Sequence, residues 1–308
     1  NKIEDLNEKH LIYLYYSIPI LFLIGRAQVD IVFSYLGLNL IFVKFIINRN
    51  FAIFKNKIFF YKFLFCLANI FISFFSSNIE NSLFKSLTYL RFVFFLGASV
   101  YIIQSKNFIL EIFFKILLFS LILINIDIFI QYIFKFNLLG YEPVKIAYNS
   151  YRYSGFFGDE FIAGSYIQKF LLIFVILTIS NVKNFYKKFY SESFIFFSIL
   201  LILITGDRMA FISVIYTIFF IYIFYKQLRK SLLILTLILA TLLGSFLAFD
   251  KSVFDRLITI KTQLIAKKEG EFYNPHLNLI RQSIKIYKNN IIFGSGIKTF
   301  RTVCSLEK

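Results

Sequence analysis

The sequence predicts an all-α protein, a polytopic bundle of transmembrane helices. Of its 308 residues, 58% are hydrophobic, and the mean hydropathy is +0.72, which is too apolar for a single soluble core. Several apolar runs reach the length of about 20 residues that a helix needs to cross a bilayer. The strict alternation of a membrane barrel strand is absent, so each segment must satisfy its backbone polar groups as a helix.

Nine segments meet this description, and we expect each to span the membrane. They are 11–25, 27–47, 58–76, 83–103, 108–134, 161–180, 193–206, 209–225 and 231–249. Residues 1–10 are of mixed charge and the first apolar run lacks a small-residue cleavage site, so no cleavable signal peptide is expected. We expect 1–249 to form the bundle, with a functional outer loop at 135–160, and 250–308 to begin a large outer loop.

The net charge of +17 could suggest nucleic acid, but the placement of the charges favours a membrane orientation. The N-terminal segment and alternate loops carry 15 Lys and Arg residues, against six in the short loops of the other side. Because cytoplasmic loops are enriched in Lys and Arg, we expect the N-terminus inside and 135–160 outside. The tail after Asp250 carries 11 Lys and Arg, which opposes this orientation, although long segments translocate largely regardless of charge.

Arg91, Asp127 and Lys169 are ionisable residues within predicted spans. Each lies about eight residues below the expected outer boundary, a depth of roughly 12 Å at 1.5 Å per residue. A charge inside a span costs about 2.5–3.5 kcal/mol on insertion scales, so such residues usually face a bundle interior or a wet cavity. We therefore expect one outward-facing polar cavity that binds substrate. The alternatives are a structural pair, such as Asp127 with Arg91, or a Lys169 that reaches the membrane surface.

The stretch "YRYSGFFGDEFIAGSYI", 151–167, interrupts the apolar helices. Arg152 offers a planar fork of donors for phosphate oxygens, and Gly155 and Gly158 permit backbone amides to line an anion site. Asp159 and Glu160 fall where we expect the next helix to begin, and the helix dipole alone favours acidic residues there. Glu160 could instead accept a proton or bind sugar hydroxyls.

Two further motifs are expected on the outer side. "TGDRMAF", 205–211, is a short turn that keeps Arg208 at the interface. "HLNLIRQSIKIYKNN", 276–290, has one apolar and one basic face, which suits an amphipathic helix on the outer leaflet near a lipid-linked phosphate. His276 begins this helix and Arg281 lies on its polar face. A lone histidine is more often structural than catalytic, and no set of residues has metal-ligand spacing, so no metal is expected.

In this order, "IDIFIQYIFKFNLLGYEP", "YRYSGFFGDEFIAGSYIQKF", "ITGDRMAF" and "HLNLIRQSIKIYKNNIIFGSGIKTFRTVC" resemble the O-antigen ligase and O-antigen polymerase (Wzy-like) group, from about Pro19 to Cys304. The resemblance implies a metal-independent, GT-C-like membrane glycosyltransferase of the bacterial inner membrane that needs no cofactor. Its donor would be a glycan on undecaprenyl pyrophosphate, used on the periplasmic side. The acceptor would be a second lipid-linked glycan or lipid A core, and both polymerase and ligase remain open.

The resemblance also implies roles for residues. Arginines would stabilise the pyrophosphate leaving group, and an acidic residue or histidine would activate the acceptor hydroxyl. The candidate catalytic residues are Arg152, Glu160, Arg208 and His276, and the candidate substrate-binding residues are Arg91, Asp127, Asp159, Lys169 and Arg281.

One departure from the family's pattern concerns the general base. The group continues to an "HPHN"-like stretch, and this chain ends in "FRTVCSLEK" before any such motif and begins without Met. We therefore expect a fragment that lacks its C-terminal part, and whether the general base lies in that part stays open.

Transport is the competing class. A flippase for the same lipid-linked glycan, or an anion transporter, would also need a basic cavity. Transporters, however, commonly show repeated halves with Gly or Pro breaks near the midplane. Such a repeat is not visible in the sequence, and the polar groups lie toward one face.

Overall fold

The computed structural model describes residues 2–146, 150–181, 185–224, 229, 241, 267–268, 271–272 and 275–306. This part of the chain is mostly helical, as predicted. Among the described residues, three helices are long and apolar enough to cross a membrane: Arg26–Ile47, Ile79–Gln104 and Leu110–Phe134. Shorter apolar helices cover Ala163–Thr178, Glu192–Thr205 and Arg208–Phe224. The predicted span 231–249 lies, except for residue 241, outside the described residues, so the count of nine stays a prediction.

The chain divides into two compact units. The first comprises Asn1–Tyr15, Ala27–Phe108 and Gln263–Lys308. The second comprises Tyr16–Arg26 and Ile109–Thr262. Helix α1 contributes its first part to one unit and its second part to the other. The predicted division at residue 249 follows membrane sidedness rather than packing, and it stays a prediction.

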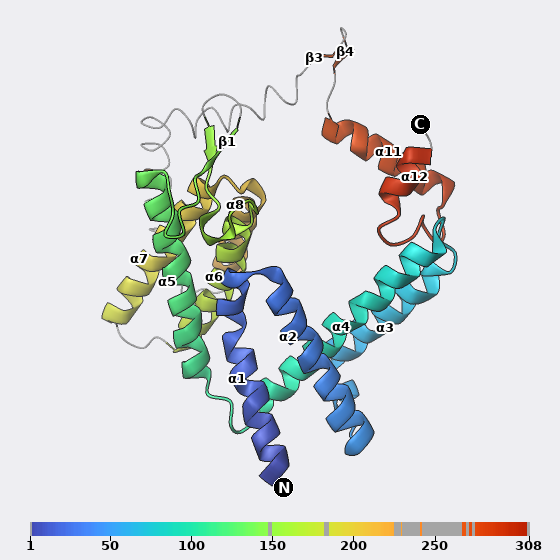
Figure 1. Ribbon diagram of the computed structural model, residues 1–308, viewed down its shortest axis with the longest axis horizontal. Coiled ribbons are helices and arrows are strands. Elements are labelled where there is room, and N and C mark those ends of the chain that lie inside the picture. Colours follow the sequence, from blue (N-terminus) through green and yellow to red (C-terminus); the bar gives the residue numbers. More distant parts are fainter. Residues whose placement is uncertain are drawn as a thin grey trace. The chain divides into compact units, whose positions relative to one another are not determined.

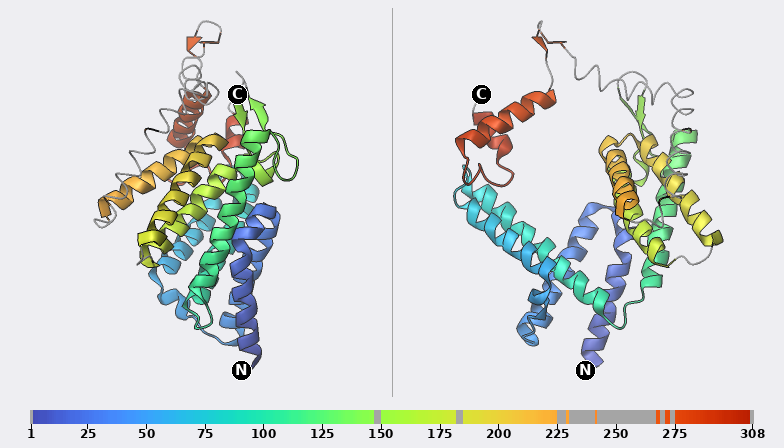
Figure 2. Two further views of the ribbon diagram at one scale, coloured as in Figure 1. Left: turned by 90° about the vertical axis from the view of Figure 1, so that its left-hand side faces the viewer. Right: turned by 180° about the vertical axis from the view of Figure 1, so that it is seen from behind.

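The first unit is built from helices on a long hairpin, α3 and α4, which lie side by side (Figures 1 and 2). Its elements are α1 (Lys2–Ile24, in part), α2 (Arg26–Asn39), the π-helix η1 (Leu40–Ile47), the short η2 (Ala52–Lys55), α3 (Lys57–Ser73), α4 (Ile79–Gln104), β3 (Lys267–Lys268), β4 (Glu271–Phe272), α11 (Pro275–Asn289) and α12 (Phe300–Leu306).

Local chemistry sets the limits of the hairpin. Asn56 begins α3 because its side chain accepts bonds from the Ile58 and Phe59 amides, and Asn78 begins α4 by accepting from the Asn81 amide. Between the two helices, Phe59 and Cys66 are buried against Val93.

The segment before α12 is fastened to the turn between α3 and α4. The Ser295 carbonyl accepts bonds from the Ser76 hydroxyl at 2.9 Å and from the Ser77 amide at 3.1 Å. The Ile297 amide donates to Ser82 Oγ at 3.0 Å. The Phe293 ring stacks on Phe75 with centroids 4.2 Å apart. Helix α11 covers the stretch predicted to form an amphipathic helix, and its place on a membrane surface stays a prediction.

In the described part of the second unit, four helices and the end of α1 pack around an apolar core. Its elements are α5 (Leu110–Phe134), β1 (Val144–Ile146), β2 (Ser150–Arg152), the short η3 (Gly155–Phe157), α6 (Ala163–Asn181), α7 (Phe185–Thr205) and α8 (Arg208–Phe224). Leu121 and Ile124 of α5 meet Ile167 of α6 and Ile202 of α7 in this core. Large apolar side chains such as Phe119 are exposed on the outer face, as expected of helices in lipid.

Two short strand pairs accompany the predicted helices. Strands β1 and β2 form an antiparallel pair that joins Val144 to Arg152, and β3 pairs with β4. β-branched and aromatic residues favour strands, and an antiparallel strand pair can form where the chain reverses direction between two helices. Helix α6 begins at Ala163, two residues later than the expected start at residue 161.

Candidate functional site

A buried polar network on α5 holds the loop that carries Arg152. Asp127 is fully buried; its Oδ1 accepts from the Leu138 amide at 2.9 Å and its Oδ2 from Asn137 Nδ2 at 3.3 Å. Asn137 Nδ2 also donates to the Gly155 carbonyl at 2.8 Å, and the Gly155 amide donates to Gln131 Oε1 at 2.9 Å. Because φ at Gly155 is +57°, glycine is favoured at this position. The network therefore fixes the loop on both sides of Arg152.

Arg152 is a half-buried cation with spare donor capacity. Its guanidinium carbon lies 4.4 Å from the centroid of the Phe161 ring, a cation–π contact. Its Nε is buried and has no hydrogen-bond partner among the described residues. Burial lowers the pKa of Arg152, the charge of Asp207 opposes this, and the charge of Arg208 adds to it. Asp207 and Arg208 are therefore close enough to Arg152 for their charges to act on it. An anion bound beside Arg152 would accept a hydrogen bond from its unpaired Nε.

The turn between α7 and α8 fixes Asp207 and Arg208. Asp207 Oδ1 accepts from the Ala210 amide at 3.2 Å, so it caps α8. Asp207 Oδ2 accepts from the Ser165 hydroxyl of α6 at 2.7 Å. At Gly164, an added Cβ would lie 2.6 Å from the Asp207 Cβ. Helix α6 thus approaches the turn closely, and Arg208, the first residue of α8, is exposed beside it.

Asp159 and Glu160 are exposed and precede α6. The expectation that they begin the helix is wrong, because α6 starts at Ala163 and has no acidic residue in its first turn. The Ile162 amide donates back to the Glu160 carbonyl at 2.9 Å, a tight turn that delays helix formation. Glu160 pairs with Arg26 at 3.0 Å, and an exposed pair of this kind contributes about 1 kcal/mol or less.

The residues predicted at membrane depth have separate surroundings. Arg91 contacts the Asp30 carboxylate of α2 at 3.2 Å. Its structural ion-pair partner is therefore Asp30, and not Asp127 as one alternative from the sequence had it. Lys169 is exposed on α6. Within the first unit, His276 lies in the first turn of α11 and Arg281 is exposed on the same helix. One common cavity for these residues stays a prediction.

Lys135, which ends α5 with a left-handed φ of +64°, lies among three tyrosines. Its ammonium donates to the Tyr153 hydroxyl at 2.9 Å and lies 5.1 Å from the Tyr132 ring centroid and 5.4 Å from that of Tyr151. These aromatic rings lie on the same loop and helix end as Arg152. Aromatic faces of this kind suit the apolar face of a sugar ring as well as a cation.

Sequence reasoning missed several of these residues: Asp207, Gln131, Asn137, Phe161 and Lys135. Two signals could have found some of them. Gln131 is polar within an apolar helix, and Asp207 stands directly before a new helix, a preferred capping position. Within the described residues, no three His, Cys, Asp or Glu side chains gather as a metal site.

Comparison with known proteins bears on the C-terminal part of the chain. The family model described as O-antigen ligase (Wzy_C) matches residues 193–305. The match confirms the resemblance predicted from the sequence. It includes Arg208, His276 and Arg281, whereas Arg152 and Glu160 precede it. No curated protein and no solved structure matches the chain.

Proposed function

Because residues 193–305 match the O-antigen ligase family model, we propose that the chain transfers or polymerises glycan units carried on undecaprenyl pyrophosphate. The reaction takes place at the periplasmic face of the inner membrane, without a metal ion or other cofactor. The acceptor is a second lipid-linked glycan or lipid A core. The observation that carries this proposal is the buried Nε of Arg152, which has no hydrogen-bond partner among the described residues and is left for an anion. The charges of Asp207 and Arg208 act on this guanidinium.

The proposed chemistry needs positive charge where a diphosphate leaves. As the bond from the anomeric carbon to the pyrophosphate oxygen breaks, negative charge grows on that oxygen, and preorganised donors in a water-poor site stabilise it. Arg152 and Arg208 supply these donors. Asp207 is a positioning residue, because its bonds to Ser165 and to the Ala210 amide hold the turn that carries Arg208. Asp159, Lys169, Arg91, Asp127 and Arg281 are the proposed binding residues.

The acceptor hydroxyl must lose a proton to a base, and Glu160 and His276 are the candidates in this chain. Glu160 is exposed and close to Arg152 in sequence. Its bond to Arg26 at 3.0 Å is weak enough to be exchanged for a sugar hydroxyl, since exposed pairs contribute little.

The alternative function is movement of the same lipid-linked glycan across the membrane, or anion transport. The distribution of polar groups favours transfer. In the second unit the network of Asp127, Gln131 and Asn137 lies toward one end of α5. The next buried polar pair along the helix, Asn125 with Ser198, is uncharged. A through pathway would need polar groups along the length of the helices.

The test is reconstitution of the full-length protein in vesicles with a lipid-linked oligosaccharide. A transferase lengthens the glycan or attaches it to an added acceptor, whereas a carrier moves it without forming a bond. We expect Arg152→Ala and Arg208→Ala each to lower glycan extension by about a hundredfold, the effect of losing one charge-stabilising group. Translocation without glycan extension by the wild-type protein would refute the proposal.

The matched control is Arg49→Asn, an exposed arginine outside this site. Arg49 has a φ of +46°, and asparagine tolerates that conformation. This variant should keep full extension. Full activity of both Arg152→Ala and Arg208→Ala would show that the site has been assigned wrongly, even if the protein is a transferase.

A further inference from the structure

A cavity in the first unit lies between the start of α1, the π-helix η1 and the end of α4. Its volume is about 700 Å³, and Leu36, Leu40 and Ile102 line its apolar side. Glu8 and Lys44 line its polar side. A smaller cavity of about 340 Å³ adjoins it and shares Lys44 in its lining. These residues are distinct from every residue of the proposed transferase site.

Lys44 is placed in this cavity by an irregular helix. Residues Leu40–Ile47 form a π-helix, a geometry that is rare and often found at functional sites. Lys44 is half-buried, and its ammonium lies 4.1 Å from the centroid of the Tyr101 ring. In the described part of the chain it has no carboxylate within ion-pair distance.

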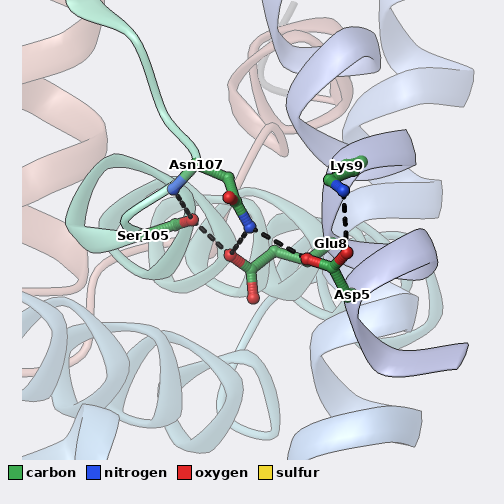
Figure 3. A network of polar contacts seen from close by, with 5 residues as sticks. All are labelled: Asp5, Glu8, Lys9, Ser105 and Asn107. Atoms are coloured by element: carbon green, nitrogen blue, oxygen red, sulfur yellow. Dashed lines mark hydrogen bonds and ion pairs between the residues drawn. The ribbon is translucent and has the colours of Figure 1, made fainter. Parts of the chain in front are cut away.

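Glu8 is the complementary group. It is half-buried, and its carboxylate accepts from the Tyr101 hydroxyl at 3.4 Å, from Asn107 Nδ2 at 3.2 Å and from the Ser105 hydroxyl. Figure 3 shows Glu8 within the network that also joins Asp5 and Lys9. All partners of Glu8 in this network are neutral, whereas Asp5 has its own cation in Lys9.

Tyr101 thus has a cation over its ring and a carboxylate on its hydroxyl, and the two charges are not paired with each other. Partly buried charges without an oppositely charged partner are costly, so a ligand that supplies one to each is favoured. The ligand must be zwitterionic, with a phosphate or other anion for Lys44 and an ammonium for Glu8. The apolar wall of Leu36 and Leu40 adds a place for an alkyl chain.

We propose that this cavity binds an aminophospholipid headgroup, with its phosphate on Lys44, its ammonium on Glu8 and its acyl chains along α2 and η1. Lys55 of the smaller cavity adds positive potential beside the phosphate. The adjoining stretch from Arg49 to Lys62 is rich in basic residues, as is usual where helices meet a headgroup layer. The site is independent of the proposed function.

The test measures lipid binding to the delipidated full chain by native mass spectrometry. Phosphatidylethanolamine, phosphatidylglycerol and soluble phosphoethanolamine are added separately. We expect phosphatidylethanolamine to bind about tenfold more tightly than phosphatidylglycerol, since only its ammonium forms a charge-assisted bond to Glu8. Soluble phosphoethanolamine should bind much more weakly, because it buries no acyl chain.

The variants separate the two charges. Glu8→Gln should lower phosphatidylethanolamine binding by about tenfold and leave phosphatidylglycerol unchanged, whereas Lys44→Met should lower both and Lys44→Arg should keep both. Glu111→Gln and Lys57→Gln are matched controls, because these exposed residues do not line the cavity. Thermal unfolding without added lipid checks that each variant is folded.

Three results would overturn the proposal. The first is equal binding of the two phospholipids by the wild-type protein. The second is a loss of binding in the control variants as large as in Glu8→Gln and Lys44→Met. The third is soluble phosphoethanolamine that binds as tightly as the lipid, which would assign the site to a soluble aminophosphate.

Discussion

Replacing Gly296 by alanine should undock the segment before α12 from the α3–α4 turn. An added Cβ would lie 2.0 Å from Ser76 Oγ, 2.5 Å from Ser76 Cβ and 2.9 Å from Ser82 Oγ. Rotating the Ser76 hydroxyl relieves only the first of these contacts, because the Cβ is fixed to the backbone. Gly296 also has a φ of +105°, which an alanine adopts only with strain.

Backbone strain and steric overlap both destabilise the docked segment in Gly296→Ala. The backbone strain contributes about 1–3 kcal/mol, and overpacking against Ser76 about 1–3 kcal/mol more. A total of about 3 kcal/mol corresponds to roughly a hundredfold rise in the population of the undocked segment. Gly294 gives the control: its φ is +68° and an added Cβ meets nothing within 4 Å. Gly294→Ala should therefore show the strain alone, about 1–2 kcal/mol.

Hydrogen–deuterium exchange of peptides covering 75–79 and 293–299 measures this directly. The amides of Ser77 and Ile297, which donate to Ser295 and to Ser82, report docking. We expect faster exchange in Gly296→Ala than in Gly294→Ala. Part of the lost protection from exchange should return when Ser76→Gly is combined with Gly296→Ala. Equal exchange in the two alanine variants would refute the steric argument.

Two further predictions concern the second unit. Gly164→Ala should push α6 away from Asp207 and destabilise the protein by about 1–3 kcal/mol, since the added Cβ would lie 2.6 Å from the Asp207 Cβ; an unchanged thermal unfolding midpoint would contradict this packing. Asp127→Asn should cost about 1–3 kcal/mol, because one amide oxygen must replace two oxygens that accept bonds. Exchange at the Leu138 amide, measured beside a conservative Ile126→Val control, should rise only in Asp127→Asn.

The predicted helices are largely present because their signal is local. Apolar residues dominate 79–104 and 110–134, and in lipid a helix is the way for such a segment to satisfy its backbone polar groups. Both segments are long enough to cross a membrane. The end points depend on single contacts. The start of α6 at Ala163 follows from the turn formed by the Ile162 amide and the Glu160 carbonyl, which no periodicity of apolar residues reveals.

The candidate site was predictable in its charged members and not in the groups that position them. Arg152 and Arg208 are conspicuous between apolar helices, and the distribution of basic residues predicts on which side they lie. Arg208 follows Asp207 directly in the sequence, but the proximity of Arg152 to Asp207 depends on the packing of α6 against the α7–α8 turn. Asn137 and Gln131 hold Gly155 through hydrogen bonds that join residues 18 and 24 positions apart.

The sequence by itself therefore predicted that the helices are apolar enough for a membrane, the positions of most of them, and which charged residues lie between them. It could do so because hydrophobicity and charge act on each segment separately. Tertiary structure decided the partners. Asp30 rather than Asp127 contacts Arg91. Gly296, which has no Cβ, lets Ser76 approach closely, and Tyr101 contacts both Glu8 and Lys44. Such pairings depend on how helices distant in sequence pack together, and a one-dimensional pattern does not encode that packing directly.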